Sequence, residues 1–302
     1  MKLRIGTRRS RLALAQATEV ADRLRGLGAE VELVPMLTSG DRGAAPRGRG
    51  GLKGLFVAEI VRALQRGEVD LAVHSAKDLP ARDPDGVVVA AVPERAPPFD
   101  VLVTRDGALP DGATVGTSSL RRRAQLLRAR PGVRVRELRG NVDTRLARLE
   151  AGEVDGLVLA AAGLARLGIA PPHATPFPIE EMVPAPGQGA LAVQARAEDR
   201  WTLEVVRDLD HPRSRAAFEA ERALVGLLGG DCLLPLGAYA EAREEGVRLL
   251  AVVVRPDGRD LAWAQAEAED PLAVAREVAA LLVSGGAEAI LAEARAATRG
   301  QG

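Results

Sequence analysis

A chain of 302 residues is long enough to form two or three domains, each with its own core. Hydrophobic residues make up 47% of the sequence and charged residues 27%, whereas aromatic residues make up only 2%, so we expect cores of Leu, Val and Ala. Lys plus Arg and Asp plus Glu both number 41, and this zero net charge argues against nucleic acid or an anionic membrane surface as a partner.

The few cysteines and histidines limit the chemistry further. A single cysteine excludes an internal disulfide and a cysteine-cluster metal site, and the three histidines have no ligand spacing, so we expect no metal. No apolar run approaches the roughly 20 residues that span a bilayer, and no apolar segment follows the charges at the amino terminus. We expect a cytoplasmic protein that does not associate with membranes. We also expect a monomer, because no apolar heptad repeat favours self-association.

The first ninety residues alternate between short strand-like runs and helical patterns. In chain order these segments are 3–5, 12–24, 31–34, 56–64, 71–73 and 87–92. Such alternation predicts a parallel sheet with helices on both faces. Residues 38–54 are rich in Gly and Arg and lack apolar periodicity, so we expect them to form a lid over a cleft.

Proline residues end this first series. Pro93, Pro97 and Pro98 cannot continue a helix or a central strand, which predicts a hinge at residues 93–100. A second alternation starts at Val101 and closes in the proline-rich stretch 171–186. Its segments are 114–116, 119–130, 133–138, 142–151 and 157–160.

The pattern changes again after residue 212. A long helical pattern at 213–228 is followed by apolar strands at 247–254 and 261–264 and by a closing helical region. These segments predict a third, smaller α/β unit.

Two short strings occur once in each of the first two series. Gly-Glu-Val-Asp precedes an apolar run at residues 67–70 and again at 152–155. A Gly-Thr pair leads from a strand-like run into a helical pattern at residues 6–7 and again at 116–117. Strings this short also recur by chance, but their matching context favours two domains of similar plan.

Each Gly-Thr turn leads into a helix N-terminus, where unpaired backbone N–H groups and partial positive charge favour an anion. Arg8 follows the first turn, and Arg121 and Arg122 follow the second. Because guanidinium groups bind carboxylates bidentately, we infer a ligand with several carboxylates. The basic residues further along the second helix are interpreted as solvated surface: Arg123, Arg128 and Arg130.

The segment His-Ser-Ala-Lys-Asp-Leu-Pro at residues 74–80 follows a strand-like run, where open α/β sheets place ligand sites. Asp78 is suited to act as a general acid or as a counter-charge to a cationic intermediate. Lys77 is suited to lowering the pKa of Asp78 or to contacting a substrate carboxylate. A Lys-Asp pair beside a proline is more often a plain turn, so spacing alone leaves both interpretations open.

The lone cysteine, Cys232, follows Gly229-Gly230 on a short predicted loop. A free cysteine is usually a small buried hydrophobe. His211 is distant in sequence, so no base can be assigned to the thiol. The residues alone leave the role of Cys232 open.

In their order along the chain, these motifs resemble those of the porphobilinogen deaminases (hydroxymethylbilane synthases). The matching segments are 5–10 with 12–14 and Gln16, 54–57, 74–80, 115–122, 139–142 with 144–146, 159–163, 186–190, and 229–230 before Cys232. The resemblance covers essentially the whole length, and several collinear motifs are specific where one alone is not.

The resemblance implies a transferase that carries a dipyrromethane cofactor, bound to Cys232 through a thioether. Four porphobilinogen molecules are added in turn, each losing ammonia, and the linear tetrapyrrole hydroxymethylbilane is released by hydrolysis. The implied fold is α/β, with two doubly wound, mainly parallel domains like the halves of a periplasmic binding protein and a smaller C-terminal α/β domain. The implied domains are 1–94 with 188–208, 100–186, and 212–302.

Carried over position by position, the resemblance makes Asp78 the catalytic residue and Cys232 the cofactor anchor. Further cofactor-binding positions are Ser75, Lys77, Thr117, Ser119, Arg121, Arg122, Arg145 and Gln188. Substrate-binding positions are Arg8, Ser10, Phe56, Ser118, Arg139 and Arg166. These residues suit the chemistry, because a carboxylate stabilises the positive charge that develops when ammonia leaves, and arginines offset the carboxylates of a growing chain.

Two positions depart from the pattern of the porphobilinogen deaminases. Leu52 stands where a second glycine is usual before Lys53-Gly54, which bears on the expected lid. Asp231 lies between the two glycines and Cys232 and shifts the local spacing by one residue.

Two other classes of function compete with this interpretation. A solute-binding protein for an anionic ligand would also use paired helix N-termini, but it has no need of Cys232 and usually carries a signal peptide, which is not found here. A nucleic-acid binder acting through residues 119–130 disagrees with the zero net charge and with the scarcity of aromatic residues for base stacking.

Overall fold

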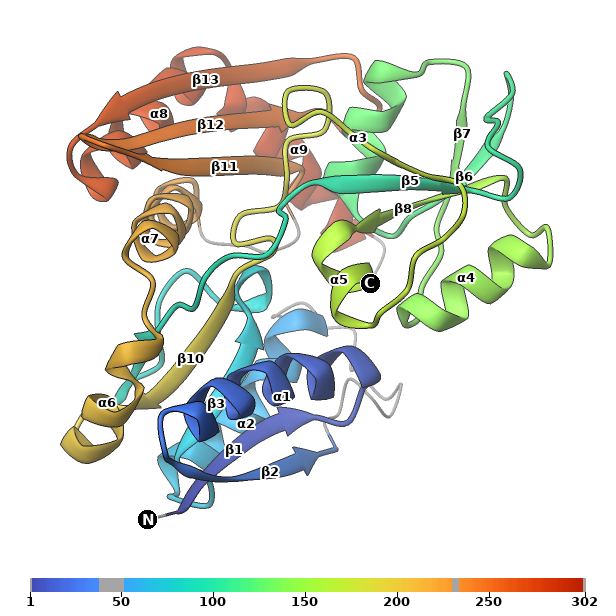
Figure 1. The fold of residues 1–302 in the computed structure, drawn as a ribbon. Coiled ribbons are helices and arrows are strands. Elements are labelled where there is room, and N and C mark those ends of the chain that lie inside the picture. Colours follow the sequence, from blue (N-terminus) through green and yellow to red (C-terminus); the bar gives the residue numbers. More distant parts are fainter. Residues whose placement is uncertain (1, 38–51, 230–233, 301–302) are drawn as a thin grey trace.

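A computed structural model describes residues 2–37, 52–229 and 234–300, with side chains except at 52–56 and 298–300. These described residues form three sheets, each with its own helices (Figure 1). Among the described side chains, the cores consist mainly of Leu, Val, Ile and Ala, as the composition predicts, and the buried aromatic residues are Phe177 and Phe218.

The first sheet has the strand order β2-β1-β3-β10-β4. Its strands are β1 (Lys2–Arg8), β2 (Glu30–Met36), β3 (Leu71–Ser75), β4 (Val87–Ala91) and β10 (Leu191–Arg196). Its helices are α1 (Arg11–Gly26), α2 (Leu52–Gln65) and α6 (Arg200–Val206). Strand β10 is antiparallel to β3 and β4, while β1 is parallel to β2 and β3. Helices α1 and α6 contribute to the core on one face, and α2 contributes to the core on the other.

The second sheet has the order β7-β6-β8-β5-β9. Its strands are β5 (Asp100–Thr104), β6 (Thr114–Gly116), β7 (Arg134–Arg136), β8 (Gly156–Ala160) and β9 (Ala174–Pro176). Its helices are α3 (Leu120–Ala129), α4 (Val142–Glu150) and α5 (Ala161–Arg166). Leu149 of α4 and Leu164 of α5 pack in one core, whereas Leu126 of α3 packs in another.

The first two sheets are built to one plan. In each, the fourth strand of the order is the antiparallel one, and it is the strand that the chain enters after crossing from the other sheet. The two crossing segments, residues 92–99 and 177–190, lie side by side, since the Ala96 N–H donates to the Gly189 carbonyl over 3.3 Å. Gly189 has φ +88, and a Cβ there would collide with the Ala96 carbonyl, so this close approach requires glycine. The expected repetition of plan is therefore confirmed.

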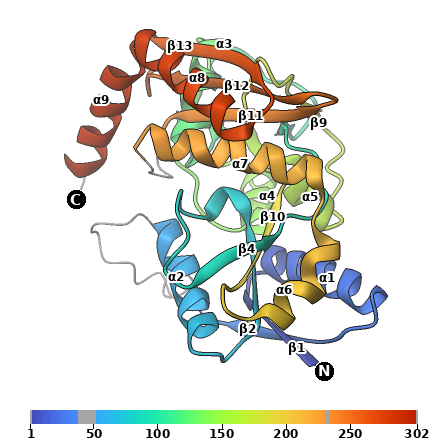
Figure 2. The ribbon, with the colours of Figure 1, turned by 90° about the vertical axis from the view of Figure 1, so that its left-hand side faces the viewer.

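The third sheet is antiparallel, with the order β11-β12-β13. Its elements are α7 (Pro212–Leu227), β11 (Leu236–Arg243), β12 (Gly246–Val254), β13 (Leu261–Ala268), α8 (Pro271–Ser284) and α9 (Ala287–Gly300). Helices α7, α8 and α9 share one core with this sheet, and Figure 2 shows α7 lying between the sheet and the lower half of the molecule. On its other face, Leu250, Val252 and Val254 pack against Ala124 of α3, so the third sheet is joined to the second by apolar contact.

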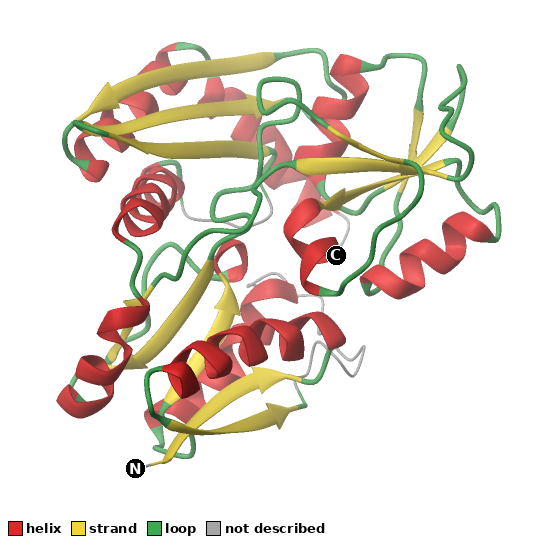
Figure 3. Cartoon of the chain, in the orientation of Figure 1, coloured by secondary structure: helices red, strands yellow, loops and turns green. Residues whose placement is uncertain are grey.

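The expected α/β class is confirmed, and the periodic segments fall on helices and strands as predicted (Figure 3). Elements without a sequence prediction are β9, β10, β11, α5 and α6. Strand β9 lies within the proline-rich stretch, and β11 has the sequence LGAYAEAR, whose small apolar residues give a weak alternating pattern. The prediction of a loop over residues 38–54 is wrong for its last three residues, because α2 already begins at Leu52. Residues 38–51 lie outside the described residues. The limits proposed for the three domains stay a prediction.

Candidate functional site

A cavity of about 300 Å³ lies where all three sheets meet, and we call it the Asp78 cavity. Its lining comes mainly from the 3-10 turn after β3, the start of α3, the second crossing segment, α7, and the start of β11 with Leu234 just before it. Asp78 is the only carboxylate among the described residues that line it. The cations that line it are Lys77, Arg121, Arg122, Arg145 and Arg222.

A second cavity of about 200 Å³ lies between the first two sheets, and we call it the arginine cavity. It shares Lys77, Arg122 and Arg145 with the Asp78 cavity, so the two are neighbours. The cations of its lining are Arg8, Arg11, Lys77, Arg122, Arg145 and Arg166, whereas Asp143 is the only carboxylate of its described lining. Such an excess of positive charge in a cavity favours a multiply anionic ligand.

Both Gly-Thr turns lead into helices as predicted. Ser10 caps α1, because its hydroxyl accepts from the Ala13 N–H over 3.3 Å, and Ser119 caps α3 in the same way with the Arg122 N–H over 3.4 Å. The Thr117 hydroxyl accepts from the Ser119 N–H, which fixes the turn before α3. The two helix N-termini thus stand at the cavities, with Ser10 in the lining of the arginine cavity and Ser119 in that of the Asp78 cavity.

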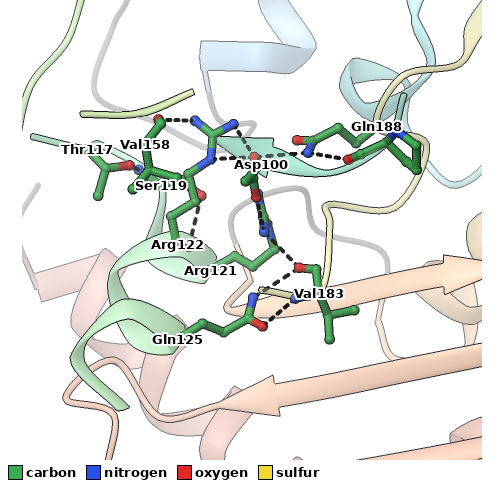
Figure 4. A network of polar contacts seen from close by, with 10 residues as sticks. Asp100, Thr117, Ser119, Arg121, Arg122, Gln125, Val158, Val183 and Gln188 are labelled. Atoms are coloured by element: carbon green, nitrogen blue, oxygen red, sulfur yellow. Dashed lines mark hydrogen bonds and ion pairs between the residues drawn. The ribbon is translucent and has the colours of Figure 1, made fainter. Parts of the chain in front are cut away.

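The guanidinium groups of Arg121 and Arg122 form ion pairs with a carboxylate of the protein itself (Figure 4). Asp100, which is fully buried at the start of β5, lies 2.7 Å from Arg121 Nη1 and 2.8 Å from Arg122 Nη2. Arg122 also donates to the Val158 carbonyl over 2.9 Å, and Arg121 donates to the Val183 carbonyl over 2.7 Å. Sequence reasoning assigned both arginines to a ligand and missed Asp100; whether they also reach a ligand stays a prediction.

The charges around Asp100 hold that group ionised. Burial alone would raise the pKa of the Asp100 carboxyl, but the adjacent guanidinium groups of Arg121 and Arg122 outweigh it and place that pKa well below its usual range. The sequence feature that could have indicated a buried, paired Asp100 is its position directly before the apolar run Val101-Leu102-Val103. A buried acid needs a partner, and here the partners are the two arginines.

Gln188 joins the same network and is itself fully buried. Its Nε2 donates to the Pro98 carbonyl over 2.7 Å and to Asp100 Oδ1 over 2.9 Å. The Gln188 side chain therefore connects the two crossing segments, while the residue also lines the Asp78 cavity.

A second buried carboxylate ties the crossing segments to α7. Glu221 is fully buried and pairs with Arg95 at 2.7 Å. It also accepts from the backbone N–H groups of Gly187 (2.5 Å) and Ala240 (2.7 Å). Both crossing segments and the third unit thus meet at Glu221, and the second crossing segment also lines the Asp78 cavity.

Arg145 and Arg166 each keep a buried nitrogen that has no hydrogen-bond partner in the described part of the chain, Nε of Arg145 and Nη2 of Arg166. Burial, followed by the charge of Arg122, lowers the pKa of Arg145 to about 10. At neutral pH the Arg145 guanidinium is still protonated, so a ligand carboxylate in the arginine cavity would stabilise it.

The post-strand segment lies at the cavities as predicted. Ser75 ends β3 and exchanges hydrogen bonds with Gln16 of α1 at 2.7 and 3.1 Å, while Lys77 and Asp78 lie in the following 3-10 turn. Just past this turn, Arg222 of α7 donates to the Pro80 carbonyl and pairs with Asp83 at 2.9 Å. Sequence reasoning did not single out Arg222, and its contact across about 140 residues leaves no local signal.

His74, the first residue of the 74–80 segment, lies in β3 and is buried, and its Nε2 has no hydrogen-bond partner among the described residues. Burial lowers the pKa of His74 to about 4, with the charge of Arg8 acting in the same direction and that of Asp78 against it. The imidazole is therefore neutral in the folded protein at neutral pH.

This neutral histidine should make the protein less stable in mild acid. Between pH 6.5 and 4 the unfolded chain binds a proton at residue 74 that the folded chain does not, so stability falls as the pH drops through this window. The loss should be about 2 kcal/mol between pH 7 and pH 5. Urea unfolding at both pH values measures it, and His74→Phe should reduce this pH dependence by about that amount. An unchanged pH dependence in the variant would assign the effect to other groups.

Four predicted site residues are not placed at a cavity by the described side chains. Arg139 is two-thirds exposed, pairs with Glu137 at 2.7 Å, and lines neither cavity. Thr117 is buried beneath the turn that it stabilises. The side chain of Phe56 in α2 and the whole of Cys232 lie outside the described residues. Leu234, two residues after Cys232, does line the Asp78 cavity.

Comparison with known proteins identifies the family. The family model "Porphobilinogen deaminase, dipyromethane cofactor binding domain" matches residues 3–204, and "Porphobilinogen deaminase, C-terminal domain" matches residues 216–284. The chain belongs to the porphobilinogen deaminase family. The porphobilinogen deaminase of Rubrobacter xylanophilus is 48% identical over 295 residues, covering 96% of both chains. That of Brevibacillus brevis is 45% identical over 300 residues, covering 97% of both.

Membership of the porphobilinogen deaminase family makes the chain a transferase of porphyrin biosynthesis with a dipyrromethane cofactor-binding domain. Among solved structures, the methionine-binding protein MetQ is similar with 15% identity and a TM-score of 0.44, over 69% of this chain and 89% of that one. A periplasmic substrate-binding protein from Coxiella burnetii is similar with 17% identity and a TM-score of 0.42, over 68% of this chain and 91% of that one. Within the described ranges, no helix is both long and apolar enough to span a bilayer.

Proposed function

We propose that the chain joins four porphobilinogen molecules head to tail onto a dipyrromethane primer bound to Cys232, releasing ammonia at each addition and finally hydroxymethylbilane. The single observation that carries this proposal is the position of Asp78: it is the only carboxylate in the described lining of a cation-rich cavity, next to a second cavity in whose described lining cations outnumber the one carboxylate, Asp143. A substrate that carries carboxylates and becomes cationic as it reacts needs both kinds of group.

The described residues suit a cofactor rich in carboxylates. Arg121, Arg122 and Arg145 outnumber the buried Asp100, so this part of the lining of the Asp78 cavity keeps a net positive charge. Arg145 Nε is buried without a hydrogen-bond partner in the described chain, as expected of a group that awaits an acceptor. We propose that Lys77, Ser119 and Arg145 hold carboxylates of the cofactor, with Ser75, Thr117, Arg121, Arg122 and Gln188 orienting them. When bound, the dipyrromethane supplies a pyrrole carbon that acts as the nucleophile.

The residues of the chain then have separate tasks. Arg8, Ser10 and Arg166, which line the arginine cavity, bind carboxylates of the incoming porphobilinogen. Ser118, Phe56 and Arg139 are proposed as further substrate-binding residues. Asp78 faces the positive charge that develops as ammonia leaves the substrate and stabilises it. The same carboxylate is suited to move the proton that the new bond releases.

Cytoplasmic location and a monomeric state complete the proposal. They rest on the lack of an apolar spanning or repeating segment in the sequence. The site does not favour the alternative of a solute-binding protein, because such a protein requires no carboxylate among the cations of its binding site.

The intact mass of the purified protein tests the cofactor proposal. The wild-type mass should exceed the sequence mass by two linked porphobilinogen-derived units, and Cys232→Ser should remove that excess because no other thiol exists in the chain. Circular dichroism serves as the control for folding of the variant. A wild-type mass equal to that of the bare chain, together with no bilane formed from porphobilinogen, would contradict the proposal.

A further inference from the structure

Helix α1 of the first sheet contacts the helices of the second sheet through two ion pairs. Arg11 at its start pairs with Asp143 of α4 at 2.6 Å, and Glu19 two turns later pairs with Arg166 of α5 at 2.8 Å. Helices α1 and α5 pack against each other, as Figure 1 also shows. The covalent connections between the two sheets are the crossing segments, so these ion pairs are additional, breakable links between them.

Arg166 is the more buried partner and the one that faces a cavity. Its side chain is 7% exposed, and the residue lines the arginine cavity. Its Nε donates to Glu19 Oε2 over 2.8 Å, while its Nη2 is buried and has no hydrogen-bond partner among the described residues. A buried guanidinium that is only half satisfied favours a second carboxylate, because its nitrogens bind such groups in pairs.

Glu19 reaches Arg166 from outside the cavity. Its side chain is 28% exposed, it is absent from the cavity lining, and its Oε1 also accepts from Arg23 one turn further along α1 at 3.4 Å. The Glu19 carboxylate is therefore partly solvated and held by a second cation. It can leave Arg166 without being stranded as an unpaired buried charge, because water and Arg23 remain as partners.

We propose that Glu19 is a specificity-determining residue: an internal carboxylate that occupies Arg166 in the ligand-free protein and is exchanged for a carboxylate of the ligand. This inference rests on the proposed function, which supplies the carboxylate-bearing ligand. The exchange keeps the buried Arg166 paired at every stage. Competition from Glu19 also weakens the binding of each ligand carboxylate to Arg166. Weaker binding suits a site through which a growing chain must pass.

Glu19→Gln tests the exchange, because it keeps the shape of the side chain and removes the competing charge. The KM of the holoenzyme for porphobilinogen should fall about fivefold, as expected for loss of a partly exposed ion pair, with kcat within twofold of wild type. Asp22→Asn is the matched control: it makes the same charge change on the same helix at an exposed carboxylate that pairs with Arg25. Its KM should equal that of wild type.

Calorimetric titration with citrate gives a readout that needs no turnover. Glu19→Gln should bind citrate about fivefold more tightly than wild type, and this gain should vanish when it is measured in an Arg166→Ala background. An unchanged or raised KM and Kd in Glu19→Gln, or a gain that persists without Arg166, would overturn the inference. If the wild type fails to turn over porphobilinogen, the proposed function fails instead, and the citrate titration still decides the role of Glu19.

Discussion

Asp78→Asn is expected to lower kcat for bilane formation by at least a factor of about 100 while the protein stays folded. Asp78 is the only carboxylate of the described lining of its cavity, and the neighbouring cations Lys77, Arg121, Arg122 and Arg145 raise the cost of a second positive charge there. Asparagine keeps the shape of the side chain but cannot offset the charge that develops when ammonia leaves. Steady-state release of ammonia and formation of bilane measure the loss.

Two further variants make the result specific to the Asp78 carboxylate. Asp78→Ala should be as inactive as Asp78→Asn, because both lack the negative charge. Asp85→Asn removes an exposed carboxylate seven residues later and should keep wild-type turnover. Thermal unfolding should give similar midpoints for all three variants. Near-normal turnover in Asp78→Asn would remove Asp78 from the mechanism.

The elements that carry the site were predictable because their signals are local. A Gly-Thr turn between an apolar run and a serine cap fixes a strand, a turn and a helix start within about ten residues, and this happens twice, at Ser10 and Ser119. The place of Asp78 after β3 follows from the same kind of local pattern. Matching topology then brings the two turns to neighbouring cavities, since the two sheets share one strand order.

The partners of the charged residues were not predictable in the same way. Arg121 and Arg122 pair with Asp100, 21 and 22 residues earlier in the chain, and Arg222 pairs with Asp83 across 139 residues. An arginine at a helix start gives the same sequence signal whether its guanidinium meets a ligand or a buried carboxylate. Burial decides between these two, and burial depends on tertiary packing. The antiparallel strand β10 escaped prediction for a related reason, because its partners β3 and β4 lie about a hundred residues away.

Asp100→Asn is expected to destabilise the protein by about 3–5 kcal/mol, measured by urea unfolding at neutral pH. The substitution removes the one negative charge that pairs with two buried arginines, whose side chains are only 4% and 8% exposed. Arg121 and Arg122 would then repel each other in a site from which water is largely excluded. Asp111→Asn, at an exposed position before β6, is the control and should change stability by less than about 0.5 kcal/mol.

The pH dependence of this difference identifies its origin. The pKa of Asp100 in the folded protein lies below its value in the unfolded chain, so the carboxylate contributes its full stabilisation above about pH 4, the unfolded value. That contribution is lost as the pH falls through the folded pKa. The gap between wild type and Asp100→Asn should therefore be constant from pH 7 to pH 5 and shrink in stronger acid. A gap that stays constant below pH 3 would assign the loss to altered packing rather than to the charge of Asp100.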